Sequence, residues 1–217
     1  MTERTMEADA VRGQLITFEG IDGSGKTTQI RLLQTWLEDA GHDVLILREP
    51  GGTPIGEQIR TILLSTANAD MSPVSELLLF EAARAQLVHE VIAPALAAGK
   101  VVICDRFIDS TVAYQGYGRG LDPALVDQLN RLAIGNMVPD LTIWLDAPRE
   151  MLQERISRRA GKADRLDREK DAFRQRTLDG FAEQRSMHPA RIQRVDTSRS
   201  KEETHQTIVE LVRRTLQ

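Results

Sequence analysis

The sequence is poor in cysteine, in aromatic residues and in long apolar runs. Its single cysteine, Cys104, excludes an intrachain disulfide and lies in an apolar run at 101–104, where a buried thiol is expected. Because aromatic residues make up only 4% of the chain, the core has to be built from Leu, Ile, Val and Ala, as in a parallel sheet covered by helices. No apolar run is long enough to span a bilayer, and the N-terminus has no apolar signal segment. We therefore expect a cytoplasmic protein without membrane association.

The chain also lacks an excess of positive charge. Its 28 Lys and Arg residues and 32 Asp and Glu residues give a net charge of −4, which offers no support for a nucleic-acid-binding surface. The length of 217 residues suits one α/β domain, which we place at residues 14–217. Residues 1–13 mix acidic and basic side chains and are expected to form a flexible tail.

Residues 20–27 carry the strongest motif, with the sequence Gly-Ile-Asp-Gly-Ser-Gly-Lys-Thr. This is the spacing at which a backbone loop wraps a phosphate, and a buried strand at 15–18 and an amphipathic helix at 28–37 flank it as that loop requires. Lys26 is expected to reach the β- and γ-phosphates of ATP, and the Thr27 hydroxyl to bind Mg²⁺. The residues expected to contact the nucleotide are Gly20, Ile21, Asp22, Gly23, Ser24, Gly25, Lys26, Thr27 and Thr28.

Strand patterns alternate with helical patterns along the rest of the chain, which predicts a parallel sheet of about five strands with right-handed crossovers. The expected strands are 15–18, 44–47, 101–104, 141–146 and 191–195, and the expected helices are 28–37, 72–98, 122–134, 168–186 and 201–216.

Two strand ends carry polar residues on the side where open α/β sheets bind ligands. Arg48 and Glu49 precede a Pro-Gly-Gly turn, and their pattern fits substrate contact and a solvated turn equally well. Asp105 ends the third strand and is the candidate to hold Mg²⁺, with a helix cap as the alternative. Arg106 beside it is suited to a phosphate, because its planar guanidinium can bond two oxygens at once.

Two further groups of charge leave alternatives open. Arg84 falls on the apolar side of the helix at 72–98, where it either pairs with Glu81 or joins Phe80 in binding a planar base. Residues 149–176 hold ten basic and six acidic residues, which is typical of a solvated helix surface. Since a phosphate loop is present, a basic flap that closes over the transferred phosphate is the better interpretation.

Four stretches together resemble the thymidylate kinase family, from about residue 15 to the final helix. They are residues 18–29, 48–53 and 80–84, and the pair 105–106 with 113–116. The resemblance implies a P-loop nucleoside monophosphate kinase fold with a five-stranded parallel sheet, a short basic lid at about 158–166, ATP and Mg²⁺ as cofactors, dTMP as acceptor substrate, and a homodimer.

By this resemblance, Phe80 stacks on thymine, Arg84 and Gln115 bond its polar edge, and Tyr114 crowds the sugar against a 2′-hydroxyl. The resemblance also implies that Arg48 and Arg106 hold the acceptor phosphate and that Ser110 belongs to the acceptor site. It places Asp22 near the 3′-hydroxyl of the sugar or near the metal.

The phosphate loop itself has Gly23 and Ser24 at its variable positions and therefore supplies no arginine. The resemblance is to the bacterial arrangement, in which the lid provides the catalytic arginine. Arg158 and Arg159 are the preferred candidates and Arg165 is the third. Family members often carry Glu where this chain has Asp167.

We expect in-line transfer of the γ-phosphate of ATP to dTMP, giving dTDP and ADP, with Lys26, Asp22, Arg106 and Arg158 or Arg159 as catalytic residues. A uridylate or adenylate kinase on the same scaffold is one alternative. A P-loop regulatory module that binds nucleotide and signals through a partner is another.

Overall fold

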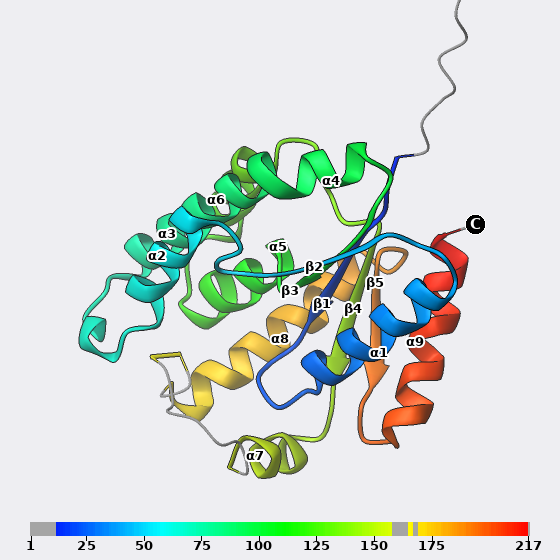
Figure 1. Ribbon diagram of the computed structural model, residues 1–217. Coiled ribbons are helices and arrows are strands. Elements are labelled where there is room, and N and C mark those ends of the chain that lie inside the picture. The colour runs from blue at the N-terminus through cyan, green and yellow to red at the C-terminus, as the bar shows by residue number, and fades with distance from the viewer. Residues whose placement is uncertain (1–11, 158–164, 167–168, 217) are drawn as a thin grey trace, which may run out of the picture.

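A five-stranded parallel sheet forms the centre of the protein, in the strand order β2-β3-β1-β4-β5 (Figure 1). The computed structural model describes residues 12–157, 165–166 and 169–216. The strands are β1 (Leu15–Glu19), β2 (Val44–Arg48), β3 (Val101–Asp105), β4 (Leu141–Asp146) and β5 (Ile192–Asp196). All five residues of β1 are buried, because β3 and β4 flank it and helices cover both faces.

Helices cover the two faces of the sheet. Their bounds are α1 (Lys26–Asp39), α2 (Pro54–Leu64), α3 (Pro73–Leu87), α4 (Ala93–Ala97), α5 (Ile108–Thr111), α6 (Pro123–Ile134), α7 (Arg149–Ser157), α8 (Asp171–Met187) and α9 (Lys201–Thr215), with short helical turns η1 (Thr66–Asn68), η2 (Val88–Ile92) and η3 (Val112–Gly118). Helices α1 and α9 lie side by side on one face (Figure 1).

The alternation of side chains along β1 divides the apolar core between these faces. Ile16 and Phe18 pack with residues of α1 and α9. Leu15 packs on the opposite face, in a cluster that includes residues of α3, η2 and α4. A third cluster forms around Trp144 and Phe181, whose rings stack where β4 meets α8.

The five strands and their parallel arrangement confirm the predicted sheet. The helix expected at 72–98 is present as α3, η2 and α4 in succession, with a π-helical turn in η2. Helix α2 was not predicted, because the Pro-Gly-Gly sequence was interpreted only as a turn. Its start has a local signal: the Thr53 side chain accepts a hydrogen bond from Gly56 N at 2.9 Å, and Pro54 occupies the first turn.

The N-terminal boundary is visible at Gly13. Its amide donates to Leu96 O at 2.8 Å, and a Cβ at this position would lie 2.0 Å from Lys100 O. Gly13 is therefore packed against the folded domain, whereas residues 1–11 of the predicted tail lie outside the described residues. In the described part of the chain, no helix is long and apolar enough to cross a membrane, and the cytoplasmic location stays a prediction.

Candidate active site

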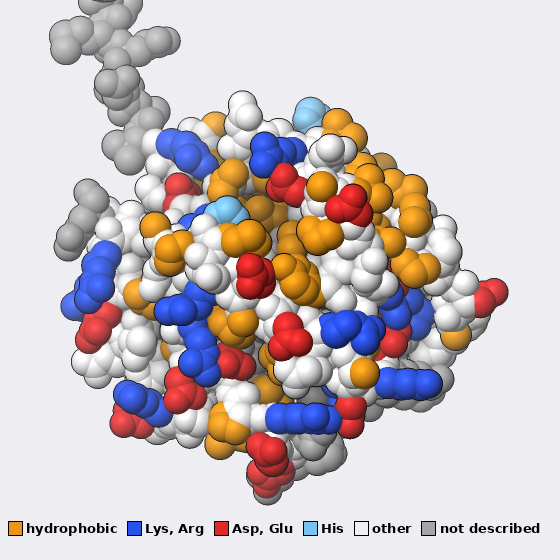
Figure 2. Space-filling view, turned by 180° about the vertical axis from the view of Figure 1, so that it is seen from behind, with side chains coloured by type: hydrophobic (Ala, Val, Ile, Leu, Met, Phe, Trp, Pro, Cys, Tyr) orange, Lys and Arg blue, Asp and Glu red, His pale blue; other side chains and the backbone are white. Residues whose placement is uncertain are grey.

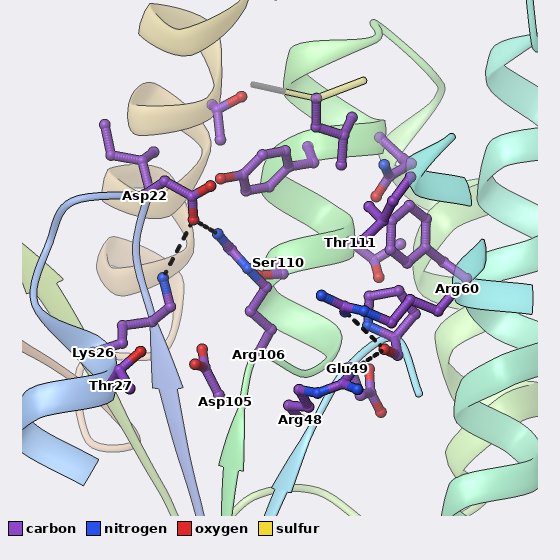
Figure 3. Close-up of a pocket in the computed structure, with 18 of the residues that line it drawn as sticks. Asp22, Lys26, Thr27, Arg48, Glu49, Arg60, Asp105, Arg106, Ser110 and Thr111 are labelled. Atoms are coloured by element: carbon purple, nitrogen blue, oxygen red, sulfur yellow. Dashed lines mark hydrogen bonds and ion pairs between the residues drawn. The ribbon is translucent and has the colours of Figure 1, made fainter. Parts of the chain in front are cut away.

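A cavity of about 540 Å³ opens at the carboxyl ends of β1, β2 and β3 (Figure 3). Within the described residues, every predicted site residue except Gly20, Ser24 and the third lid candidate Arg165 lines this cavity. The lining members of the prediction are Ile21, Asp22, Gly23, Gly25, Lys26, Thr27, Thr28, Arg48, Phe80, Arg84, Asp105, Arg106, Ser110, Tyr114 and Gln115. The tertiary structure thus brings together the four stretches that the sequence separates by up to about a hundred residues.

The loop between β1 and α1 passes close to the backbone of β4. Gly20 has φ 131°, and a Cβ there would lie 2.4 Å from Leu145 O, so only glycine fits. The Lys26 ammonium group donates to Gly20 O at 3.0 Å. Burial, with Arg106 as a second cause, lowers the pKa of Lys26 to about 8. An incoming phosphate would favour the charged form of this side chain and so raise that pKa.

Arg106 lies between the phosphate loop and the rest of the cavity. Its Nη2 donates to Asp22 Oδ1 at 2.9 Å and its Nη1 to Gly20 O at 3.0 Å, and Lys26 Nζ is 4.0 Å from the same Asp22 oxygen (Figure 3). Arg106 has φ 73°, a conformation that costs a side-chain-bearing residue about 1–3 kcal/mol. Its guanidinium also lies 5.1 Å from the centre of the Tyr114 ring.

Glu19 at the end of β1 supports the turn that carries Arg106. Its Oε1 accepts hydrogen bonds from Phe107 N at 2.8 Å and Ser110 N at 3.2 Å, and its Oε2 is 2.5 Å from the Ser110 hydroxyl. Burial and then the charge of Asp109 raise the pKa of Glu19 to about 8. Ser110 in turn accepts from Arg106 Nη1 at 3.2 Å, so Glu19 acts on Arg106 through Ser110.

Asp105 and Thr27 present oxygen atoms to the cavity near the phosphate loop (Figure 3). Asp105 Oδ1 is buried without a hydrogen-bond partner among the described residues. Carboxylate and hydroxyl oxygens are the ligands that Mg²⁺ prefers, and Mg²⁺ usually takes only one or two carboxylates together with phosphates and water. These two residues therefore fit the predicted metal, although no group of three or more His, Cys, Asp or Glu in the described chain could hold one by itself.

Arg84 is 1% exposed and is held by acidic groups. Its Nε donates to Glu49 Oε2 at 2.8 Å and its Nη1 to Glu81 Oε1 at 2.8 Å and Asn130 Oδ1 at 3.0 Å. Its Nη2 lies 2.7 Å from Glu49 Oε2 and donates to Phe107 O at 3.2 Å. The ion pair with Glu81, one of the two sequence alternatives, is thus present, and a direct bond from Arg84 to a base stays a prediction.

Glu49, one of the two acids around Arg84, is perturbed by its burial. Desolvation raises the pKa of Glu49 to about 7, against the opposing effect of Arg84. Glu49 Oε1 and Glu81 Oε2 are buried without partners in the described structure, so the cluster holds two carboxyl groups and one guanidinium away from the protein surface.

Tyr114 and Gln115 enter the cavity from η3. Burial raises the pKa of the Tyr114 hydroxyl to about 12, so it is neutral at physiological pH. Gln115 is 1% exposed and donates from Nε2 to Glu76 Oε1 at 2.7 Å. Phe80, on α3, lines the same cavity with a half-buried ring.

The other arginines predicted for the site differ in their relation to the cavity. Arg48 makes a two-point ion pair with Glu57, with Nη2 at 3.0 and 2.9 Å from the two carboxylate oxygens. Arg158 and Arg159 lie outside the described residues. Arg165 is buried, with Nε donating to Leu63 O at 2.9 Å and Nη1 2.5 Å from Glu76 Oε2, and it does not line the cavity.

Several cavity residues were missed in the sequence. Arg60 of α2, Thr111 of α5 and Arg174 of α8 line the cavity. Arg155 of α7 reaches the phosphate loop, with Nη1 3.4 Å from Gly23 O, and its Nη2 donates to Thr197 O at 2.8 Å. Arg60 had a usable signal, because the helix cap at Thr53 predicts α2 and places Arg60 within it. Arg155 and Arg174 lie in the basic region 149–176 that was interpreted as a flap, although neither was singled out.

Comparison with known proteins gives the family. The family model described as Thymidylate kinase matches residues 18–208. The chain is 49% identical over 195 residues to a thymidylate kinase of Pelotomaculum thermopropionicum, covering 90% of each chain. This chain belongs to the thymidylate kinase family. A thymidylate kinase of Geotalea uraniireducens is 48% identical over 205 residues, which cover 92% of this chain and 96% of the relative.

A solved member of the thymidylate kinase family has the same fold. The crystal structure of thymidylate kinase from Ehrlichia chaffeensis matches with a TM-score of 0.76 and 37% sequence identity, covering 93% of this chain and 99% of that chain. The predicted P-loop kinase fold is therefore confirmed. The phosphate loop, the cations Lys26 and Arg106 and the ring of Phe80 line one cavity, an arrangement that suits phosphoryl transfer.

Proposed function

We propose that this member of the thymidylate kinase family transfers the γ-phosphate of ATP to dTMP, giving dTDP and ADP. The observation that carries the proposal is the single cavity that runs from the phosphate loop past Arg106 to Phe80, Tyr114 and Gln115. A P-loop regulatory module would not need the second half of this cavity.

In the proposed reaction an oxygen of the dTMP phosphate attacks the γ-phosphorus in line, and the bond to the β-phosphate oxygen breaks. The loop amides and Lys26 hold the donor phosphates, and Arg106 neutralises charge on the acceptor. Asp22 orients Arg106 through their 2.9 Å hydrogen bond. Thr27 and Asp105 are the residues that would hold Mg²⁺, which supplies charge neutralisation for the phosphates when bound.

The decisive experiment is an acceptor panel in a coupled assay of ADP release. We expect turnover with dTMP to exceed that with dUMP, UMP and AMP. A preference for AMP or UMP would identify a different nucleoside monophosphate kinase. Slow ATP hydrolysis that no acceptor stimulates would instead support the regulatory module.

We propose that Arg158 or Arg159 is the arginine that neutralises the negative charge of the transferred phosphate in the transition state. The phosphate loop has no arginine of its own, and Arg165, the third lid candidate, is occupied by Glu76 and the end of α2. Arg158→Ala or Arg159→Ala should lower kcat by roughly 10³-fold, as with other transition-state arginines. Near-normal turnover in both variants would return the role to Arg165 or to Arg155.

The proposal includes a homodimer that packs through α2 and α3. Ile62, Val74 and Leu78 on these two neighbouring helices are exposed, although large apolar side chains usually avoid water in such numbers. Figure 2 shows hydrophobic side chains gathered toward the side of the molecule on which α2, α3 and α6 lie. A twofold dimer would bury the same apolar surface of both copies.

A further inference from the structure

Glu76 of α3 is a fully buried carboxylate that connects three segments of the chain. Arg119 donates to it from Nε at 3.1 Å and from Nη2 at 2.9 Å. Arg165 lies 2.5 Å from Oε2, and Gln115 Nε2 donates to Oε1 at 2.7 Å. The hydrogen bonds of Arg119 and Gln115 hold the pKa of Glu76 below its usual value despite its burial. Glu76 is therefore ionised at neutral pH.

An ionised carboxylate can only accept hydrogen bonds, and this decides how the Gln115 amide is oriented. Its nitrogen must face Glu76, because the reverse orientation would bring the amide oxygen against a carboxylate oxygen. No hydrogen bond between described residues uses Gln115 Oε1. This atom is also not one of the fully buried polar atoms that lack a partner in the described structure. Since Gln115 lines the cavity, Oε1 is the acceptor that it offers to a bound ligand.

We propose that Glu76 is a positioning residue for base selection: it holds the Gln115 amide with its oxygen toward the cavity, so that the site accepts a base with a ring N–H and rejects one with a ring lone pair at that place. The inference rests on the proposed function, since it concerns the acceptor nucleotide of that reaction. Thymine has a hydrogen on N3, whereas cytosine has a lone pair there. A buried site built to bond a donor rejects an analogue that lacks it, because its own polar atom is left unpaired.

Arg84, the other polar group predicted at the base, does not make this distinction by itself. Its N–H groups are directed at Glu49, Glu81, Asn130 and Phe107 O. A guanidinium also has no acceptor atom with which to read a ring N–H. The orientation of Gln115 therefore decides whether the site can bond the N3–H of thymine or the N3 lone pair of cytosine.

Glu76→Gln tests this with little change of shape. Glu76 Oε2 accepts from two guanidinium groups, through Arg119 Nη2 and Arg165 Nη1, whereas Oε1 accepts from one guanidinium, through Arg119 Nε, and from the neutral Gln115 amide. The new side chain should therefore keep its oxygen at the Oε2 position and turn its nitrogen toward Gln115. The Gln115 amide must then turn over and present N–H to the cavity. We expect the ratio of the dCMP and dTMP dissociation constants, measured by titration calorimetry, to fall at least about tenfold.

A double-mutant cycle distinguishes an effect of Glu76 on the Gln115 amide from a general disturbance of the site. In a Gln115→Leu background, E76Q should leave the ratio unchanged, because no amide remains to be turned. Arg165→Gln removes another partner of Glu76 and should lower the melting temperature without changing the ratio. Where E76Q alone fails to fold, E76Q/R165Q removes one anion together with one cation, and the same fall in ratio is expected.

A measurement on the wild-type protein needs no change at position 76. N3-methyl-dTMP has no N3 hydrogen and should compete with dTMP at least about tenfold more weakly, with less difference in Gln115→Leu. Equal competition, or an unchanged ratio in folded E76Q, overturns the inference. If the wild-type enzyme phosphorylates dTMP in either case, the proposed function stands, and if it does not, the proposed function itself fails.

Discussion

Arg84 lines the cavity and also belongs to a buried cluster of charged side chains. Its guanidinium forms ion pairs with the buried carboxyl groups of both Glu49 and Glu81. Removing one partner of a buried pair leaves charge uncompensated, which costs about 3–5 kcal/mol. We expect Arg84→Met to lower the free energy of unfolding by this amount, measured by urea denaturation at pH 8, where Glu49, whose pKa is about 7, is ionised in the folded protein.

The matched control is Arg131→Met on α6. Arg131 pairs with Asp127 on the surface, with its side chain 76% exposed, and exposed pairs contribute about 0–1 kcal/mol. Equal losses for the two variants would show that the Arg84 cluster does not stabilise the fold.

Glu19 predicts a pH dependence of stability. Its pKa is raised from 4.5 to about 8 in the folded state, so the folded protein keeps a proton that the unfolded chain has released. The stabilisation from this proton is complete below about pH 4.5 and is lost as the pH rises to about 8. From pH 6 to pH 8 the free energy of unfolding should fall more steeply in the wild type than in Glu19→Gln, by about 1 kcal/mol per pH unit.

This comparison is made by urea denaturation at several pH values. The amide of E19Q stays neutral at every pH, and it can bond Ser110 and accept from Phe107 N as the neutral acid does. Glu49, whose pKa is about 7, is present in both proteins. Parallel pH profiles would contradict the raised pKa of Glu19.

At the scale of elements, the close approach of α8 to η3 places Tyr114 and Gln115. A Cβ at Gly180 of α8 would lie 2.9 Å from two Tyr117 side-chain carbons and 3.0 Å from Ala113 Cα. The last of these is backbone and can move only with η3 itself. We expect Gly180→Ala to push η3 away from α8, lowering the free energy of unfolding by about 1–3 kcal/mol and weakening dTMP binding.

Gly116→Ala is the control within η3. A Cβ there would meet nothing closer than 3.9 Å, and alanine favours helical backbone over glycine. We expect G116A to be neutral or slightly stabilising in thermal denaturation. If G180A is tolerated as well as G116A, the contact between α8 and η3 does not limit the position of the site.

At the scale of the whole molecule, the proposed dimer uses exposed apolar side chains of α2 and α3. Leu78→Lys places a charge on the exposed surface of α3 and should convert a dimer to a monomer in sedimentation analysis, since an unpaired charge is costly in an apolar interface. Leu32→Lys makes the same change on α1, which lies with α9 on the other side of the sheet (Figure 1). The Leu32→Lys variant should sediment with the same molecular mass as the wild-type protein. A wild-type monomer at all concentrations would refute the proposed dimer.

Much of the fold was predictable, because strands and helices leave local patterns. The periodicity of apolar residues predicted all five strands and the principal helices, with ends no more than three residues from those observed. Residues 107–120 were not assigned a structure, yet they form α5 and η3. Helical structure there depends on Glu19, whose hydrogen bonds to Phe107 N and Ser110 N cross 88 and 91 positions of sequence.

The sequence by itself determined the phosphate loop, since glycine spacing, Lys26 and the flanking elements are all within about twenty-five residues. Only the tertiary structure decided what Arg84 and Gln115 can do. Arg84 had Glu81 as a visible neighbour, but Glu49 and Asn130 lie 35 and 46 positions away. Gln115 is oriented by Glu76, 39 positions away. Hydrogen-bond orientation and buried charge depend on the groups that folding brings within about 3 Å, and a linear sequence does not contain those distances.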